Sequence, residues 1–171
     1  MGVVLGLIGG GSLSRLFELR LKYEIALLVM LVAQGLARGR FSGTSATSMG
    51  LAVWCASSVV LVACLAANRG TPGAIVGAAG VLLNVDVVLS NVGMPVVAPS
   101  GYGLTDAAVV SGSAGFYHLA GPGTLLAWAG DAVGLAAVGQ RLLLSTGDLL
   151  LAVGVIVIVF ATMTDRGAQS D

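Results

Sequence analysis

Residues 148–163 read DLLLAVGVIVIVFATM, a run in which the only charged residue is the aspartate that opens it. The same pattern of apolar runs with charges at their ends recurs along the chain. Only 9% of residues are charged, 57% are hydrophobic and the mean hydropathy is +1.00. Soluble domains have roughly a quarter of their residues charged. The sequence therefore predicts a small protein whose helices are solvated by lipid.

The length of 171 residues limits how many times the chain can cross a bilayer. A helical crossing of about 30 Å needs roughly 20 residues. We expect an all-α, polytopic membrane protein that forms one integral-membrane domain over residues 1–171, with about four full spans. The spans are predicted at about 23–37, 49–67, 73–92 and 148–163. Shorter apolar segments at about 2–10, 104–110 and 124–138 are predicted as short N-terminal, interfacial or re-entrant helices.

The basic residues between these segments indicate an orientation. Basic residues are enriched in the cytoplasmic loops of membrane proteins. Counting them favours a cytoplasmic C-terminus. The abundant Ala, Gly and Val with a single Lys are typical of a GC-rich bacterial genome, so we expect the bacterial plasma membrane as the location. The predicted cytoplasmic set is Arg15, Arg20, Lys22, Arg69 and Arg166, against Arg38, Arg40 and Arg141 on the other side.

Glycines in the third predicted span indicate close helix packing. Gly73, Gly77 and Gly80 are spaced to share a helix face, and small residues let two helix backbones approach in lipid. Before the last span, Ser145 and Asp148 have the spacing of a capping box, in which a serine side chain and an acid close the first helical turn.

Polar residues within or near the apolar segments are the candidate site. Ionisable groups at membrane depth are costly and usually face a bundle interior. Such residues could bind an ion, relay a proton or hold a polar head group. Alternatively, they hydrogen-bond neighbouring helices, and the histidine acts as an interfacial anchor beside aromatic residues. The candidate polar membrane site comprises Asn84, Asp86, Asn91, His118 and Asp131.

Several kinds of chemistry lack their motif in this sequence. There is no zinc-ligand spacing around the single histidine and no nucleophile elbow. Cys55 and Cys64 lie nine positions apart in one predicted helix and point to opposite faces, which excludes a disulfide between them. Eight basic and eight acidic residues balance, so nothing recruits nucleic acid. We expect no catalysis, no metal and no cofactor.

Short motifs occur in a recognisable order along the chain. The chain resembles an uncharacterised bacterial integral-membrane family, domain of unknown function 5317, over nearly its whole length. The resemblance implies a compact helical membrane protein and brings no established activity. The motifs are Asn68-Arg69-x-x-Pro72-Gly73, Leu83-Asn84, Asn91-x-Gly93-Met94-Pro95-Val96, His118, Gly130-Asp131 and Ser145-x-Gly147-Asp148.

Three functions fit these observations. We expect a non-catalytic small subunit or accessory factor of a larger bacterial membrane complex, with the bilayer and larger membrane proteins, or further copies of this chain, as partners. The alternative is a small oligomeric transporter, channel or lipid-handling protein that uses the polar end of the third span. The third hypothesis is a membrane enzyme, or a quinone- or haem-binding protein, that uses His118, Asp86 and Asp131.

Overall fold

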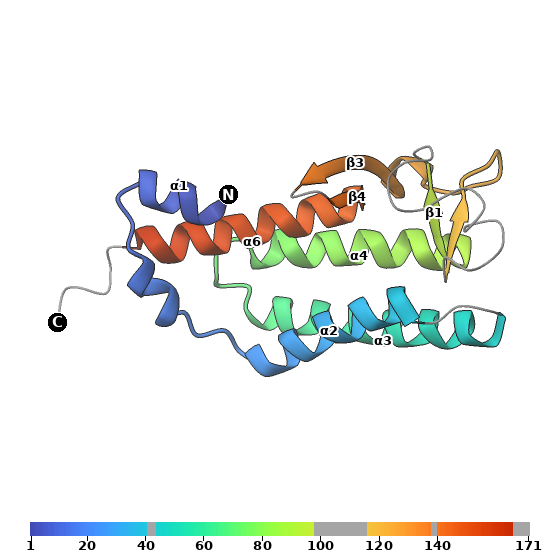
Figure 1. The fold of residues 1–171 in the computed structure, drawn as a ribbon. Helices are drawn as coiled ribbons and strands as arrows, with labels where there is room; N and C mark the ends of the chain where they lie inside the picture. The colour runs from blue at the N-terminus through green and yellow to red at the C-terminus, as the bar shows by residue number, and fades with distance from the viewer. Residues whose placement is uncertain (41–43, 98–115, 138–139, 166–171) are drawn as a thin grey trace.

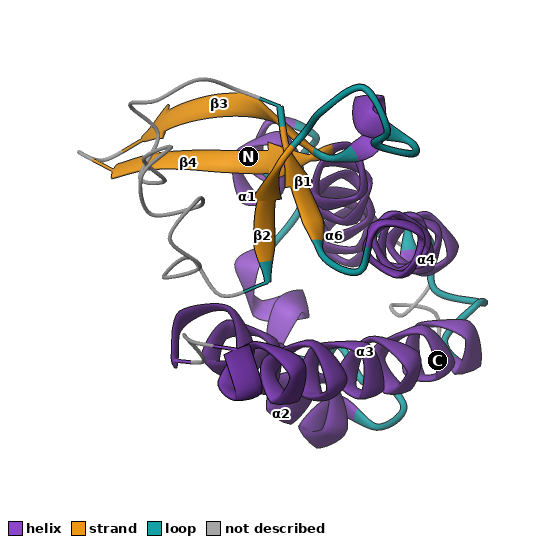
Figure 2. Ribbon diagram, turned by 90° about the vertical axis from the view of Figure 1, so that its right-hand side faces the viewer, coloured by secondary structure: helices purple, strands orange, loops and turns teal. Residues whose placement is uncertain are grey.

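The computed structural model describes residues 1–40, 44–97, 116–137 and 140–165. Two helices, α2 (Glu24–Arg40) and α3 (Thr44–Ala67), lie side by side in one layer. The helices α4 (Ala74–Asn91) and α6 (Thr146–Thr164) form a second layer, which meets the first where α3 packs on α4. A small sheet lies at one end of the molecule, beside α4 and α6 (Figure 1, Figure 2).

The helices coincide with the four predicted spans, but they do not all have the length of a crossing. Three described helices are long and apolar enough to cross a membrane: Ser48–Ala67 within α3, and the whole of α4 and α6. In α2 the apolar part, Glu24–Leu36, is shorter. These helices are consistent with a membrane location.

The N-terminal segment predicted at 2–10 forms the short helix α1 (Gly2–Ile8). Seven residues extend about 10 Å, far less than a bilayer core. The helix packs along α6, where a Cβ on Gly2 would lie 3.1 Å from the Ile156 carbonyl oxygen. A 3-10 helix, η1 (Leu13–Phe17), follows and is fastened to the end of α6, because Arg15 Nη1 donates to the Met163 carbonyl at 3.0 Å.

The closest helix pair is joined by glycines. Gly154 of α6 lies against α4, where a Cβ on it would sit 2.6 Å from the Gly77 nitrogen and 2.8 Å from the Gly73 oxygen. A Cβ on Gly80 would lie 2.7 Å from the Leu151 nitrogen. Gly73 also has a φ of +90°, which favours glycine in any surroundings. We call this contact between α4 and α6 the glycine seam. Its glycines are Gly73, Gly77, Gly80, Gly147 and Gly154.

Four strands make a mixed sheet, in the order β2-β1-β3-β4. β1 pairs in parallel with β2 and β3, and β3 pairs antiparallel with β4. β4 ends at Ser145, and α6 begins at the next residue. The strands are β1 (Met94–Val96), β2 (Tyr117–Leu119), β3 (Asp131–Ala137) and β4 (Gln140–Ser145).

The sheet corrects two predictions. The fold is mostly helical rather than all-α, and the helix predicted at 124–138 is wrong. That segment contains only the 3-10 turn η2 (Ala127–Ala129) and then β3. A short apolar run does not by its periodicity distinguish strand from helix. Here the decision comes from the backbone pairing of β3 with β4 and β1. The helix predicted at 104–110 lies outside the described residues.

A core cluster joins the sheet to the helical layers. Trp54 of α3 and Val87 of α4 are almost fully buried with Met94 and Phe116 at the sheet. The Trp54 and Phe116 rings lie 5.8 Å apart at 50°, a tilted arrangement favourable for aromatic pairs. The sheet therefore shares its hydrophobic core with the α3 and α4 helices.

The glycine seam makes a direct prediction about stability. Gly154→Leu should destabilise the protein by at least about 2 kcal/mol, because the new side chain meets α4 backbone that cannot move aside. The measurement is thermal unfolding and folded yield in mild detergent.

Gly35→Leu is the matched control, since Gly35 of α2 has nothing within 4 Å of its Cβ position. Gly77→Leu should be intermediate, because its Cβ would meet Leu151 Cδ1 at an ordinary 3.4 Å. Equal stability of the Gly154 and Gly35 variants would contradict the seam.

Candidate functional site

Three polar residues meet where the sheet joins the glycine seam. The Ser145 hydroxyl donates to Asn84 Oδ1 at 2.7 Å and accepts from the Asp148 backbone N–H at 2.9 Å. Asn84 Nδ2 donates to Asp148 Oδ1 at 2.8 Å. The Ser145 backbone N–H donates to Asp148 Oδ2 at 3.3 Å, which completes a capping box. We call Asn84, Ser145 and Asp148 the polar junction.

The polar junction is built from elements that adjoin one another. Ser145 is both the last residue of β4 and the N-cap of α6, while Asn84 faces it from α4. Gly147 leaves room for this approach, because a Cβ there would meet Asn84 Oδ1. Asp131 is opposite Ser145 in the sheet and is buried. Asn84 and Ser145 are buried and hydrogen-bonded within the junction, as buried polar side chains generally are.

The other candidate residues lie elsewhere. Asp86 is exposed, on the flank of α4 that faces away from the seam, and Ser90 is exposed one turn later. Asn91 clamps the loop before η2, since its amide donates to the Leu125 carbonyl at 2.8 Å and accepts from the Leu125 N–H at 2.9 Å. The candidate residues therefore do not converge on one site in the part of the chain that is described.

His118 occupies the short strand β2, opposite Pro95 of β1. Its side chain is partly buried, and the rings of the two preceding residues, Phe116 and Tyr117, are stacked with centroids 5.2 Å apart. Gly93 lies against the imidazole, because a Cβ there would sit 3.1 Å from Nδ1. Burial lowers the pKa of His118 below its usual value. The neutral ring is thus favoured in the folded state.

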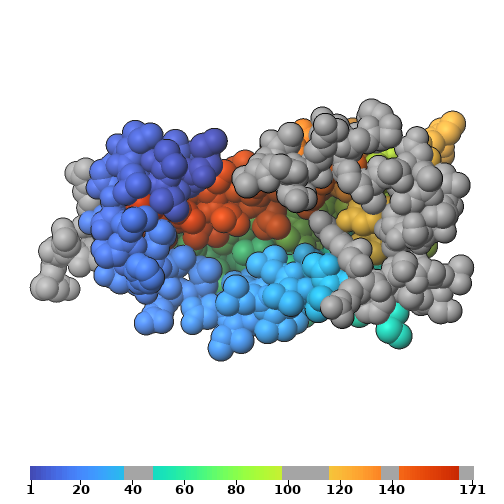
Figure 3. All heavy atoms as spheres, viewed as in Figure 1, coloured from blue at the N-terminus to red at the C-terminus, as the bar shows by residue number. Residues whose placement is uncertain are grey.

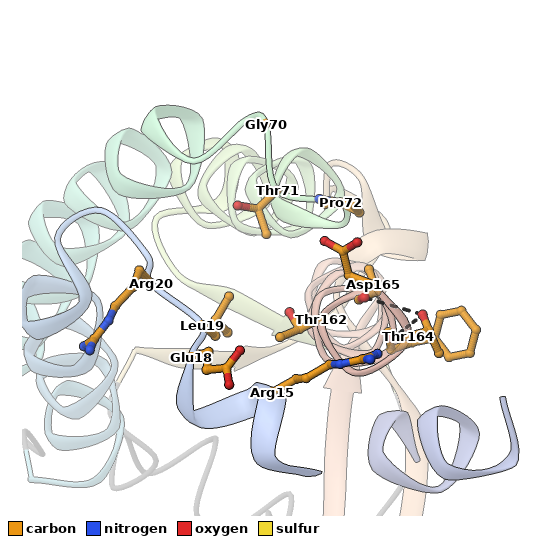
Figure 4. Close-up of a pocket in the computed structure, with 12 residues that line it drawn as sticks. Arg15, Glu18, Leu19, Arg20, Gly70, Thr71, Pro72, Thr162, Thr164 and Asp165 are labelled. Carbon is orange, nitrogen blue, oxygen red and sulfur yellow. Dashed lines mark hydrogen bonds between the residues drawn. The ribbon is translucent and has the colours of Figure 1, made fainter. Parts of the chain in front are cut away.

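A polar hollow, with a volume of about 700 Å³, lies at the opposite end of the helices. It is bounded by the segment around η1, the turn between α3 and α4, and the last turn of α6 (Figure 4). Its charges balance, with two arginines and two acids among the lining residues. The polar lining residues are Arg15, Glu18, Arg20, Thr71, Thr162, Thr164 and Asp165.

An apolar groove of about 430 Å³ separates α2 from α6. Side chains of α4 are visible between these two helices in Figure 3. The groove is lined by residues such as Leu28, Leu61 and Val155, and the only charged side chain in its lining is Glu24. Sequence reasoning missed both cavities. The one sequence feature that points to either cavity is the charged segment before α2, which forms the N-terminal wall of the polar hollow.

Among the described residues no three histidine, cysteine or acidic side chains are grouped so as to hold a metal ion. Cys55 and Cys64 are both free thiols.

Comparison with known protein families assigns this chain to one of them. The model described as Family of unknown function (DUF5317) matches residues 17–160. This chain belongs to the DUF5317 family. No curated protein and no solved structure showed significant similarity to it.

The DUF5317 match begins at the end of η1 and stops within α6. It therefore includes every residue of the polar junction, all four strands and the whole apolar groove. It leaves out α1 and the end of α6 with its Arg15 contact. The resemblance seen in the sequence motifs is confirmed as family membership.

The polar junction predicts the cost of removing its amide. Asn84→Leu should destabilise the protein by about 1–3 kcal/mol, since the Ser145 hydroxyl and the Asp148 carboxylate each lose a partner. Thermal unfolding in detergent measures this, with Ser90→Ala on the exposed flank of the same helix as control. A variant as stable as wild type would mean that the junction does not hold the seam.

The lowered pKa of His118 predicts a pH dependence of stability. The unfolded state, with a pKa near about 6.5, takes up a proton before the folded state does. The contribution of neutral His118 to the free energy of unfolding is therefore fully present above about pH 6.5. It is lost as the pH falls towards the lower pKa of His118 in the folded state. Unfolding midpoints measured across this range should fall less steeply in His118→Gln, and identical slopes would contradict the prediction.

Proposed function

We propose that this DUF5317 protein is a non-catalytic, multi-pass subunit or accessory factor of a larger bacterial membrane complex. The observation that carries the proposal is the exposure of Asp86 on a helix long and apolar enough to cross a membrane. Asp86 lies five residues before the end of α4, about 8 Å along the helix axis from Asn91. A carboxylate at such depth is costly in contact with lipid.

The flank around Asp86 is otherwise suited to helix contact. Ile75, Leu82 and Leu89 are exposed on the same side of α4, so the aspartate interrupts an apolar stripe. A second protein that offers Asp86 a hydrogen-bond donor would remove the cost of the charge and cover the stripe. Interhelical hydrogen bonds of this kind contribute to association in membranes. An assembly partner therefore accounts for both features.

We assign α2 as a fourth crossing, next to α3. Its apolar part, Glu24–Leu36, extends about 20 Å, and a short span is accommodated by local thinning of the bilayer. Four crossings put the N-terminal charged segment, the α3–α4 turn and the C-terminus on one side. The excess of basic residues assigns that side to the cytoplasm. The sheet then lies at the outer face.

A homo-oligomeric transporter or channel is the second candidate. The same exposed Asp86 favours it, because copies arranged around an axis would place several Asp86 and Ser90 side chains along one polar path. Removing the charge separates the two functions: a transporter would lose ion flux in Asp86→Asn, whereas an accessory subunit would carry no flux of its own.

The test is recovery of tagged protein from native membranes in mild detergent, read by mass spectrometry. Wild type should bring a larger membrane protein in stoichiometric amount, and Asp86→Leu should lose most of it. The control is Val153→Leu, on an exposed position of α6. Recovery of only this chain, or equal recovery by wild type and Asp86→Leu, would overturn the subunit proposal.

A further inference from the structure

The polar hollow and the apolar groove follow one another along α6. Ala161 and Thr162 line the hollow, and Ile158, one turn earlier, lines the groove. On the other wall, Arg20 of the hollow is followed directly by Leu21 of the groove. The linings of the two cavities therefore adjoin, and together they define a path that is polar at the helix ends and apolar along the candidate spans.

The hollow is rich in hydrogen-bond acceptors. The Thr162 hydroxyl donates its proton to the Ile158 carbonyl, and the Thr164 hydroxyl donates to the Phe160 carbonyl, both at 2.8 Å. Their oxygens can then act only as acceptors towards a ligand. Glu18 and Asp165 add carboxylates, and the carboxyl end of a helix favours positive charge. This part of the hollow suits a cation that carries N–H donors.

The hollow also contains a cationic side chain, Arg15, that could bind an anion. Arg15 uses Nη1 to bond the Met163 carbonyl, and a guanidinium has four further N–H donors. In Figure 4 its head lies beside the last turn of α6. Arginine binds phosphate through several donors at once. A ligand with both a phosphate and a protonated amine would match this arrangement of charges.

The apolar groove suits a hydrocarbon chain better than a helix. Its volume of about 430 Å³ is that of a small-molecule pocket, whereas a helix with its side chains is about 10–12 Å across. The one charged lining residue, Glu24, begins α2 at the end nearest the hollow. Polar groups therefore lie at one end of the path and apolar groups along the rest, as in a lipid.

We propose that the hollow and groove together bind one phospholipid with a primary-amine head group, of the phosphatidylethanolamine class. One of its two acyl chains lies in the groove between α2 and α6, the phosphate meets Arg15, and the ammonium group meets the acceptors at the end of α6. This proposal rests on the placement of α2 and α6 across a bilayer, which is part of the proposed function.

The experiment reconstitutes the full chain into nanodiscs that contain equal amounts of phosphatidylethanolamine, phosphatidylcholine and phosphatidylglycerol with identical acyl chains. Native mass spectrometry then identifies the lipid retained on release. We expect one retained phosphatidylethanolamine per chain. Choline has no N–H donor and glycerol has no positive charge, so both competitors should be retained about tenfold less.

Two pairs of variants test the two halves of the site. Leu28→Trp fills the groove, whereas Val29→Trp adds the same ring at a neighbouring exposed position that does not line it. Thr162→Val removes an acceptor from the hollow, and Thr146→Val is its control at the other end of α6. Leu28→Trp should lower retention of every lipid about tenfold. Thr162→Val should weaken the preference for the primary amine, since it removes one of several acceptors, and leave total retention little changed.

The outcomes distinguish this proposal from the one it rests on. Failure of wild type to enter nanodiscs would overturn the bilayer placement and the lipid site together. Normal insertion with no lipid preference, or a Leu28→Trp variant that retains lipid like Val29→Trp, would overturn the lipid site alone. Crosslinking of a second polypeptide into the groove would also overturn it.

Discussion

The close approach of α4 and α6 is the constraint on which the other features depend. In a bilayer, lipid would offer two apolar helices no hydrophobic drive to associate, and backbone contact at small residues would be the means available. Gly154 against Gly73 and Gly77 supplies that contact. The polar junction then forms at one end of the pair, and the N-terminal segment docks at the other through the Met163 carbonyl.

The residues that sequence analysis identified correctly are those that act locally. The capping-box spacing of Ser145 and Asp148 needs only one helical turn, and the structure contains that hydrogen-bond pair. The apolar runs were long enough to identify helices, although the structure extends the second of them back to Thr44 and leaves α2 with a short apolar part. The length of a helix and its N-terminal cap depend on residues that are close in sequence, so both can be predicted from one sequence.

The features that sequence analysis missed depend on distant pairing. The sequence predicts a helix where β3 forms, because the register of β3 with β4 and β1 cannot be seen in its own residues. The sequence places Asn84 and Asp86 on different faces of one helix but does not show what each face meets: Asn84 bonds to Asp148, whereas Asp86 is exposed. Both cavities are built from segments far apart in the chain, such as Arg20 and Thr162. The periodicity of residues within one segment cannot show which distant segments lie next to it.

The direct passage from β4 into α6 has a mechanical consequence. No loop separates the strand from the helix, and the capping box closes the joint with two hydrogen bonds. A force that tilts the sheet would therefore act directly on the N-terminal end of α6. Near the other end of α6, the Met163 carbonyl accepts hydrogen bonds from the Ser12 N–H and the Arg15 guanidinium. A displacement of the sheet would thus be transmitted along α6 to the N-terminal segment at the other end of the helix.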